Sequence, residues 1–269
     1  MRPSRPLPPP PSADALPQAQ RRRRALIDRV VEKLLAFLRR RRPPTPSVSQ
    51  CGQDIFVAQT IFRRKRGGFF LEIGGGDGRY LSNTLILETY FDWKGILVEP
   101  TSAYEQLVRN RPGATCVRAA VSDKPGTMRV VEVMDKGQVF YNPDAAEGNT
   151  LLSVVEDADV ESVYEPPDFG DVKGSFLVEA VTLDDLLTET QAPSTIDYFS
   201  FDVENSEYRI LKDFPFDKWR FNCIGVERPS EELDKLLTDN GYFLIRDGFP
   251  LDWFYLRRDF MEEWFAGID

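Results

Sequence analysis

A glycine run between a buried strand and a helix most restricts what this chain can fold into. The apolar segment 69–73 is followed by Gly-Gly-Gly-Asp-Gly at 74–78, and a helix is predicted over 83–90. Glycine lets a backbone turn sharply and approach a ligand closely. Ligands of open α/β sheets bind at the carboxyl ends of the strands, where this run would lie. The run therefore predicts an α/β domain with a ligand site after its first strand; the alternative is a tight surface turn.

Strand and helix patterns alternate along the rest of the chain. Strands are predicted over 69–73, 95–100, 115–121, 128–133, 196–203 and 222–227, and helices over 83–90, 104–110, 182–189, 207–212 and 231–240. A closing hairpin is predicted over 241–245 and 253–256. Such alternation indicates a doubly wound, mostly parallel sheet with helices on both faces.

One acidic, proline-containing segment, 135–175, interrupts this alternation. An insertion of this length in a compact domain is usually functional or disordered. We expect it to hold the determinants of substrate choice, with Tyr141, Tyr164 and Phe169 closing over a substrate.

The predicted domain follows a leader of opposite charge. Residues 1–44 carry 12 basic and 3 acidic side chains, a net of +9, whereas residues 45–269 carry a net of −18. We expect a disordered Pro-rich segment over 1–20, a basic amphipathic helix over 21–42, a Pro-rich linker over 43–47 and the folded domain over 48–269. The acidic domain is expected to repel nucleic acid.

The predicted helix 21–42 has several interpretations. It is too short and too charged to span a bilayer, which requires about 20 apolar residues. A solvated helix, weak contact with anionic membranes, an organelle address and nucleic-acid contact all remain open. Cytoplasmic localisation is favoured, with organelle targeting or peripheral membrane association as alternatives.

Residue counts exclude several classes of site. The chain has no histidine, so it can hold no Ser-His-Asp triad, no Cys-His pair and no His-ligated zinc. Its cysteines, Cys51, Cys116 and Cys223, are odd in number and widely spaced, which argues against a disulfide framework and favours a reducing compartment. Acid–base chemistry is therefore left to carboxylates, Lys, Tyr, Cys, water or the backbone.

A carboxylate follows the second predicted strand. Glu99 can accept charge-assisted hydrogen bonds from ribose hydroxyls, or it can cap the next helix. Glycine runs of this kind serve NAD, phosphates or S-adenosylmethionine. The dinucleotide pattern G-x-G-x-x-G would need glycine at Arg79 or Leu81, which disfavours NAD. Ser122, after the third predicted strand, stands where such folds face adenine, or in a plain turn.

A set of segments in the predicted domain shares a further pattern. They are 49–54, 67–78, 81–84, 93–100, 119–123, 181–187, 196–204 and 207–212. In content, order and spacing, and over about residues 49–256, they resemble the FkbM family of methyltransferases. The resemblance implies a Rossmann-like fold, similar to class I methyltransferases, that binds S-adenosylmethionine and usually methylates oxygen.

The resemblance also implies that Gly74, Gly76 and Gly78 line the cofactor, with Glu99 on its ribose. Glu72 and Ser122 are the other two residues predicted to bind the cofactor. The family commonly has a histidine where this chain has Arg228, so any role of that histidine must be filled otherwise.

Two carboxylates at the end of the fourth strand of the expected sheet, Asp202 and Glu204, are the predicted catalytic residues. Strand alternation points both to one face, and Glu227 ends the next strand. Carboxylates that share a crevice can raise one another's pKa and create a base near neutrality. Alternatives for Asp202 are contact with the cofactor, a Mg²⁺ site completed by Asn205, or a helix cap. No metal is expected.

The sequence thus favours S-adenosylmethionine-dependent methyl transfer to a hydroxyl oxygen of a small molecule or glycan. A catalytically inactive relative, tethered to a membrane or a partner by its basic helix, is the main alternative. An NAD-linked oxidoreductase is the third.

Overall fold

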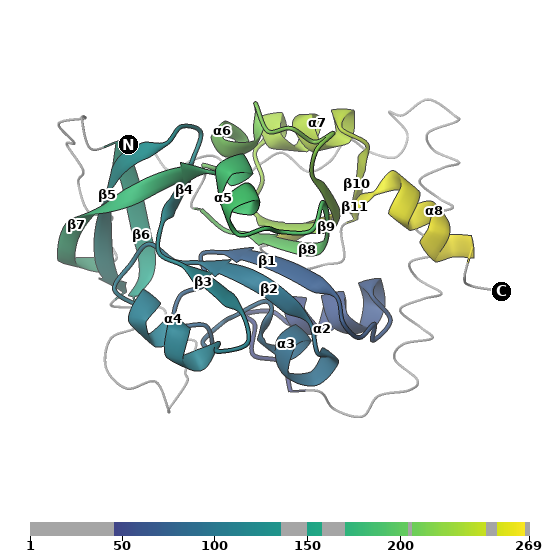
Figure 1. Cartoon of the computed structure of the whole chain (residues 1–269), viewed down its shortest axis with the longest axis horizontal. Coiled ribbons are helices and arrows are strands. Elements are labelled where there is room, and N and C mark those ends of the chain that lie inside the picture. Colours follow the sequence, from purple (N-terminus) through teal and green to yellow (C-terminus); the bar gives the residue numbers. More distant parts are fainter. Residues whose placement is uncertain (1–45, 136–149, 158–169, 204–205, 246–251, 267–269) are drawn as a thin grey trace. The chain divides into compact units, whose positions relative to one another are not determined.

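The computed structural model describes residues 46–135, 150–157, 170–203, 206–245 and 252–266 (Figure 1). The predicted disordered segment, the basic helix and most of the linker lie outside the described residues. So do Tyr141, Tyr164, Phe169, Glu204 and Asn205. Predictions that concern them stay predictions.

The described residues form a central sheet of seven strands in the order β10-β11-β9-β8-β1-β2-β3. The strands are β1 (Phe69–Ile73), β2 (Lys94–Val98), β3 (Thr115–Val117), β8 (Thr195–Phe201), β9 (Arg220–Glu227), β10 (Tyr242–Ile245) and β11 (Asp252–Arg257). Of these seven strands, β11 alone runs opposite to the other six. The chain starts at β1, adds strands on one side and then on the other, as in Rossmann-like sheets. The predicted fold class is confirmed.

Helices cover both faces of this sheet. On one face lie α5 (Leu183–Glu189), α6 (Glu207–Leu211) and α7 (Glu231–Asp239). On the other lie η2, a π-helical segment (Phe56–Ile61), α3 (Leu85–Phe91), α4 (Tyr104–Asn110) and α8 (Arg258–Ala266). Within β1, Phe70 packs on the second group, whereas Leu71 and Ile73 pack on the first. Because successive side chains of a strand point to opposite faces of the sheet, β1 contributes to two separate hydrophobic cores.

Side-chain caps explain where two of these helices begin. Thr182 accepts a hydrogen bond from the backbone of Asp185 at the start of α5, and Ser230 accepts one from Leu233 at the start of α7. Such caps satisfy backbone N–H groups that have no partner within the helix.

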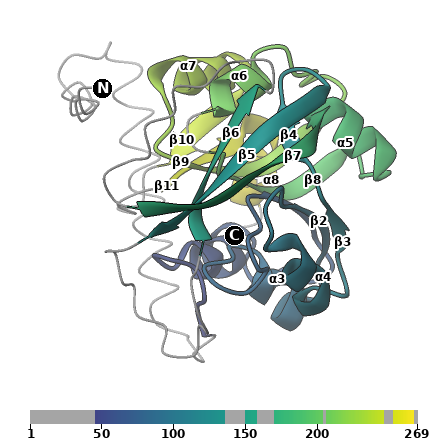
Figure 2. The ribbon, with the colours of Figure 1, turned by 90° about the vertical axis from the view of Figure 1, so that its left-hand side faces the viewer.

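A second sheet of four strands has the order β4-β7-β5-β6 (Figure 2). Its strands are β4 (Ala120–Ser122), β5 (Gly126–Asp135), β6 (Thr150–Asp157) and β7 (Gly170–Thr182). β4 runs parallel to β7, while β5 pairs antiparallel with both β6 and β7.

This second sheet corrects two expectations. The single strand predicted over 115–121 is wrong, because β3 and β4 belong to different sheets with a break between them. The described parts of the predicted insertion are strands and not irregular structure, because β5 supplies hydrogen-bonding edges to both of them. The predictions also omitted α2 (Gln53–Ile55), η2 and α8. Among the described residues, no helix is both long and apolar enough to cross a membrane.

The carboxyl edge of the central sheet collects the polar residues of interest. Gly74 follows β1, Glu99 follows β2 and Asp202 follows β8. Because β11 runs antiparallel, its first residue, Asp252, pairs with Glu227 at the end of β9 and lies at the same edge. β2 and β8 flank β1 on opposite sides, which makes this the switch point of the fold.

Candidate functional site

The glycine loop, residues 74–78, contains three glycines with positive φ that serve different purposes. A Cβ on Gly74 would lie 2.6 Å from the Asp202 carbonyl oxygen, and a Cβ on Gly78 would lie 2.6 Å from Cγ of Arg111. Both glycines are therefore required by the packing of the protein itself. A Cβ on Gly76 would meet no atom within 4 Å, so Gly76 is the position where the loop faces open space.

Glu99 connects the end of β2 to this open part of the loop. Its side chain is buried, and its Oε2 accepts a hydrogen bond of 2.7 Å from the Gly76 amide. Its Oε1 accepts one of 2.8 Å from the Thr101 amide. Burial raises the pKa of Glu99, and the hydrogen bonds from Thr101 and Gly76 oppose that rise. The structure thus brings together two residues predicted to bind the cofactor.

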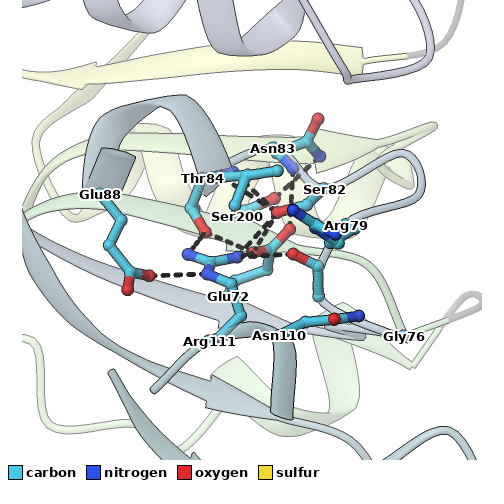
Figure 3. A network of polar contacts seen from close by, with 12 residues as sticks. Glu72, Gly76, Arg79, Ser82, Asn83, Thr84, Glu88, Asn110, Arg111 and Ser200 are labelled. Atoms are coloured by element: carbon cyan, nitrogen blue, oxygen red, sulfur yellow. Dashed lines mark hydrogen bonds and ion pairs between the residues drawn. The ribbon is translucent and has the colours of Figure 1, made fainter. Parts of the chain in front are cut away.

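Glu72 lies beneath the loop in a buried polar network (Figure 3). Its carboxylate accepts hydrogen bonds from Ser82 Oγ at 3.0 Å, from the Asn83 amide at 2.8 Å and from Thr84 Oγ1 at 2.5 Å. These partners show Glu72 holding the turn that follows the glycine loop. Its predicted contact with the cofactor stays a prediction.

Arg111, which sequence reasoning missed, is the centre of this network. Its guanidinium is 1% exposed and donates to Gly78 O at 3.2 Å, Ser82 Oγ at 3.0 Å and Thr84 Oγ1 at 2.9 Å. It also pairs with Glu88 of α3 at 2.6 Å. An arginine at the end of a predicted helix gives no sequence signal that its guanidinium is buried, because that depends on packing.

Ser122 lies in the second sheet, near its contact with α6. Its buried side chain donates to Asp123 Oδ1 at 3.1 Å. Asp123 forms ion pairs with Arg209 at 3.5 Å and Lys212 at 3.8 Å, both from α6 or directly after it. This arrangement links the sheet to α6; adenine contact by Ser122 stays a prediction.

Asp202 lies directly beside the glycine loop. Its amide donates to the Ile73 carbonyl at 3.4 Å, and its own carbonyl occupies the space that Gly74 leaves open. Its side chain is exposed. The chain then turns so that the Val203 amide donates to Glu207 Oε1 at 3.2 Å, with Glu207 buried at the start of α6.

A second carboxylate of interest, Asp252, was missed by sequence reasoning. It accepts a hydrogen bond from Gln53 Nε2 and stands opposite Glu227. Burial, aided by the charge of Glu227, raises the pKa of Asp252 to about 6. Burial, and to a smaller extent the charges of the same two carboxylates, raises the pKa of the Cys51 thiol. Only the antiparallel register of β11 reveals this position, and no local pattern encodes that register.

Asp202, Glu227 and Asp252 together form the carboxylate edge of the central sheet. In the part of the chain that the structure describes, no three Asp, Glu or Cys side chains gather closely enough to hold a metal ion.

Solved structures that align with this chain are methyltransferases of low sequence identity. The METTL16 MTase domain gives a TM-score of 0.44 at 13% identity, covering 80% of this chain and 70% of that one. Precorrin-6y C5,15-methyltransferase from Geobacter metallireducens GS-15 gives 0.41 at 9%, covering 80% and 93%. A SAM dependent methyltransferase from Aquifex aeolicus gives 0.35 at 10%, covering 84% and 96%. None of these three scores reaches 0.5, so the fold class rests on strand order and pairing.

The family comparison is more informative. No curated protein matches the chain. The model of the methyltransferase FkbM domain, however, matches residues 72–244, which include the glycine loop, Glu99, Asp202 and Glu227. The match covers more than half of the chain and confirms the resemblance found in its motifs. This protein therefore belongs to the FkbM methyltransferase family.

Proposed function

We propose that the protein transfers a methyl group from S-adenosylmethionine to a hydroxyl oxygen of a small molecule or glycan. The observation that carries the proposal is the pairing of Gly76 with Glu99. The one open glycine of the loop donates its amide to a buried carboxylate at the end of the neighbouring strand.

The residues present fit the cofactor. The Glu99 carboxylate accepts backbone hydrogen bonds from Gly76 and Thr101 and a further one from the Thr101 side chain. A carboxylate has about four acceptor sites, so capacity remains for a ribose hydroxyl. The free space at Gly76 lets a ligand lie against the backbone. The carboxylate edge attracts a sulfonium cation and repels a pyrophosphate, which favours S-adenosylmethionine over NAD.

When bound, S-adenosylmethionine supplies an activated methyl group. The chain's own task is then to orient an acceptor and receive its proton. Asp202 is our first candidate for the proton acceptor, because its backbone contacts the glycine loop and its side chain is exposed beside it. Glu204 stays a proposed partner of Asp202.

Asp252 is the competing proton acceptor. Its pKa of about 6 leaves it mostly ionised at neutral pH yet able to hold a proton, which is the range in which general bases work well. Asp202 and Asp252 can be separated by variants, because only one of them should control turnover.

Product formation tests the oxygen specificity. The full chain is incubated with S-adenosylmethionine and matched acceptor panels that carry hydroxyl groups or amino groups, and release of S-adenosylhomocysteine is measured. We expect release with hydroxyl acceptors. Release with amino acceptors alone would overturn oxygen transfer, and cofactor binding without any release would favour the inactive, tethered alternative.

We also propose that residues 21–42 give weak contact with anionic membranes, in keeping with their basic, amphipathic sequence. Flotation with vesicles that contain phosphatidylserine tests this, with and without residues 1–44. Binding that persists at high salt or without the leader would contradict it.

A further inference from the structure

Asn83, a half-buried residue in the turn after the glycine loop, uses only part of the hydrogen-bonding capacity of its side chain. The backbone of Asn83 donates to Glu72, and its Nδ2 donates to Ser200 Oγ at 3.0 Å. Its Oδ1 is buried but has no hydrogen-bond partner among the described residues. Buried polar atoms are rarely unpaired, and each exception calls for an explanation such as a missing ligand.

The rest of the amide is held firmly. Ser200 is buried in β8 and also hydrogen-bonds the hydroxyl of Tyr198, which is itself buried. That hydroxyl fills the space that Gly225 of β9 leaves open, since a Cβ there would lie 2.9 Å from it. Figure 3 shows the Asn83 oxygen on the side of the amide that faces away from the network. The network therefore holds one acceptor atom in a fixed direction. Because this atom is closed to solvent, a ligand reaches it only when neighbouring side chains move.

The position of Asn83 relative to Glu99 indicates which part of a bound ligand would contact Asn83 Oδ1. Asn83 bridges the turn after β1 to β8, since Ser200 pairs with Glu72 across the two strands. Glu99 lies on the opposite side of β1, after β2. A long ligand whose ribose lies at Glu99 and which crosses the glycine loop extends toward β8. In S-adenosylmethionine the group that extends there is the amino-acid end.

Resting on the proposed function, we infer that Asn83 Oδ1 accepts a hydrogen bond from the ammonium group of the cofactor's amino-acid end, and that Ser200 orients the amide. The ammonium offers three donors, whereas the carboxylate and the sulfur of that end offer none. Asn83 is thus a cofactor-binding residue that recognises the methionine half, as Glu99 recognises the adenosine half.

The test compares two ligands that differ only in this end. S-adenosylhomocysteine carries the amino-acid group, whereas 5′-methylthioadenosine lacks it. Calorimetry with the full chain should show that Asn83→Leu lowers the affinity for S-adenosylhomocysteine by about tenfold. The same substitution should lower the affinity for 5′-methylthioadenosine by less than about twofold. Ser200→Ala should give a smaller loss, about threefold, with the same selectivity, and remains informative if Asn83→Leu folds poorly.

Asn222→Leu is the matched control. Asn222 is a buried residue of the central sheet whose amide donates to Asp197 near the start of β9, at the edge away from the glycine loop. The Asn222→Leu variant should bind both ligands with unchanged affinity.

Equal losses for both ligands in Asn83→Leu would overturn the inference and make the amide a support of the loop. Unchanged affinities, or a loss confined to the KM of the methyl acceptor, would also overturn it. If the wild-type chain binds neither ligand, the proposed function itself fails.

Discussion

The glycine loop and the carboxylate edge lie at the same end of the central sheet, yet their polar groups are held very differently. The Asp77 carbonyl accepts a hydrogen bond from Asn110 at 2.8 Å, and Asp77 Oδ1 accepts from the Arg79 and Tyr80 amides. The Arg111 guanidinium donates hydrogen bonds to the Gly78 carbonyl and to Ser82 Oγ. The loop is therefore fixed before any ligand arrives.

The side chains of the carboxylate edge lie closer to solvent. Asp202 is exposed, and Glu227 and Asp252 are half-buried. Glu227 pairs with the exposed Arg228 at 3.4 Å, and burial raises the pKa of Asp252. A fixed loop suits binding, which gains from preorganisation. Carboxylates that can change their protonation suit proton transfer. Substitutions in the loop should thus change affinity, and substitutions at the edge should change turnover or pH dependence.

The largest expected effect is on turnover at the edge. Asp202→Asn should lower turnover at least about a hundredfold, since positioned proton transfer contributes about 10²–10⁴-fold. Affinity for S-adenosylhomocysteine should stay within about threefold. Parallel calorimetry and rate measurements check both values. Loss of binding together with turnover would make Asp202 a cofactor contact and shift the base to Asp252.

Asp252 should make stability depend on pH. Its folded-state pKa of about 6 exceeds the ordinary value near 4, so the folded protein holds this proton where the unfolded chain releases it. Stability is therefore lost as pH rises from about 4 to 6, by about 3 kcal/mol. Denaturant unfolding of wild type and Asp252→Asn at pH 4, 5 and 7 measures this contribution. Parallel stability curves for the two proteins would contradict it.

Gly76→Val should weaken S-adenosylhomocysteine binding by about tenfold, because its side chain would enter the one open space of the loop. Gly241→Val is the matched control, since Gly241 also has positive φ and no atom near a Cβ placed on it, but it directly precedes β10 at the opposite edge of the sheet. Both variants should lose similar stability, and only the first should lose affinity. Undiminished binding by Gly76→Val would remove the loop from the site.

Glu99→Gln should give the smallest effect, a loss of cofactor affinity of about fivefold, or ~1 kcal/mol. Glutamine offers one acceptor oxygen where Glu99 uses two, so one of the Gly76 and Thr101 amides would face an NH₂ group. Calorimetry and thermal unfolding are measured together. A fall in stability with unchanged affinity would make Glu99 purely structural.

Features that depend on local sequence patterns could be predicted from the sequence. The apolar run of β1, the glycines after it and Glu99 at the end of β2 were all predicted, and the α/β alternation indicated the sheet class. The break between Val117 and Ala120 was not predicted, because an apolar run does not show which sheet each half joins.

The missed site residues share one physical cause. Arg111, Asn83 and Asp252 acquire their roles through contacts between distant segments, such as the pairing of Asp252 with Glu227 across β11 and β9. A single sequence shows residue types but neither the register of a strand nor the burial of a charged group.

The most direct test of the account is calorimetric titration of the full chain with S-adenosylhomocysteine and, separately, with NAD. The pairing of Gly76 with Glu99, together with the carboxylate edge, predicts one-to-one binding of S-adenosylhomocysteine and no heat of binding with NAD. Binding of NAD, or no binding of S-adenosylhomocysteine, would contradict the proposed function.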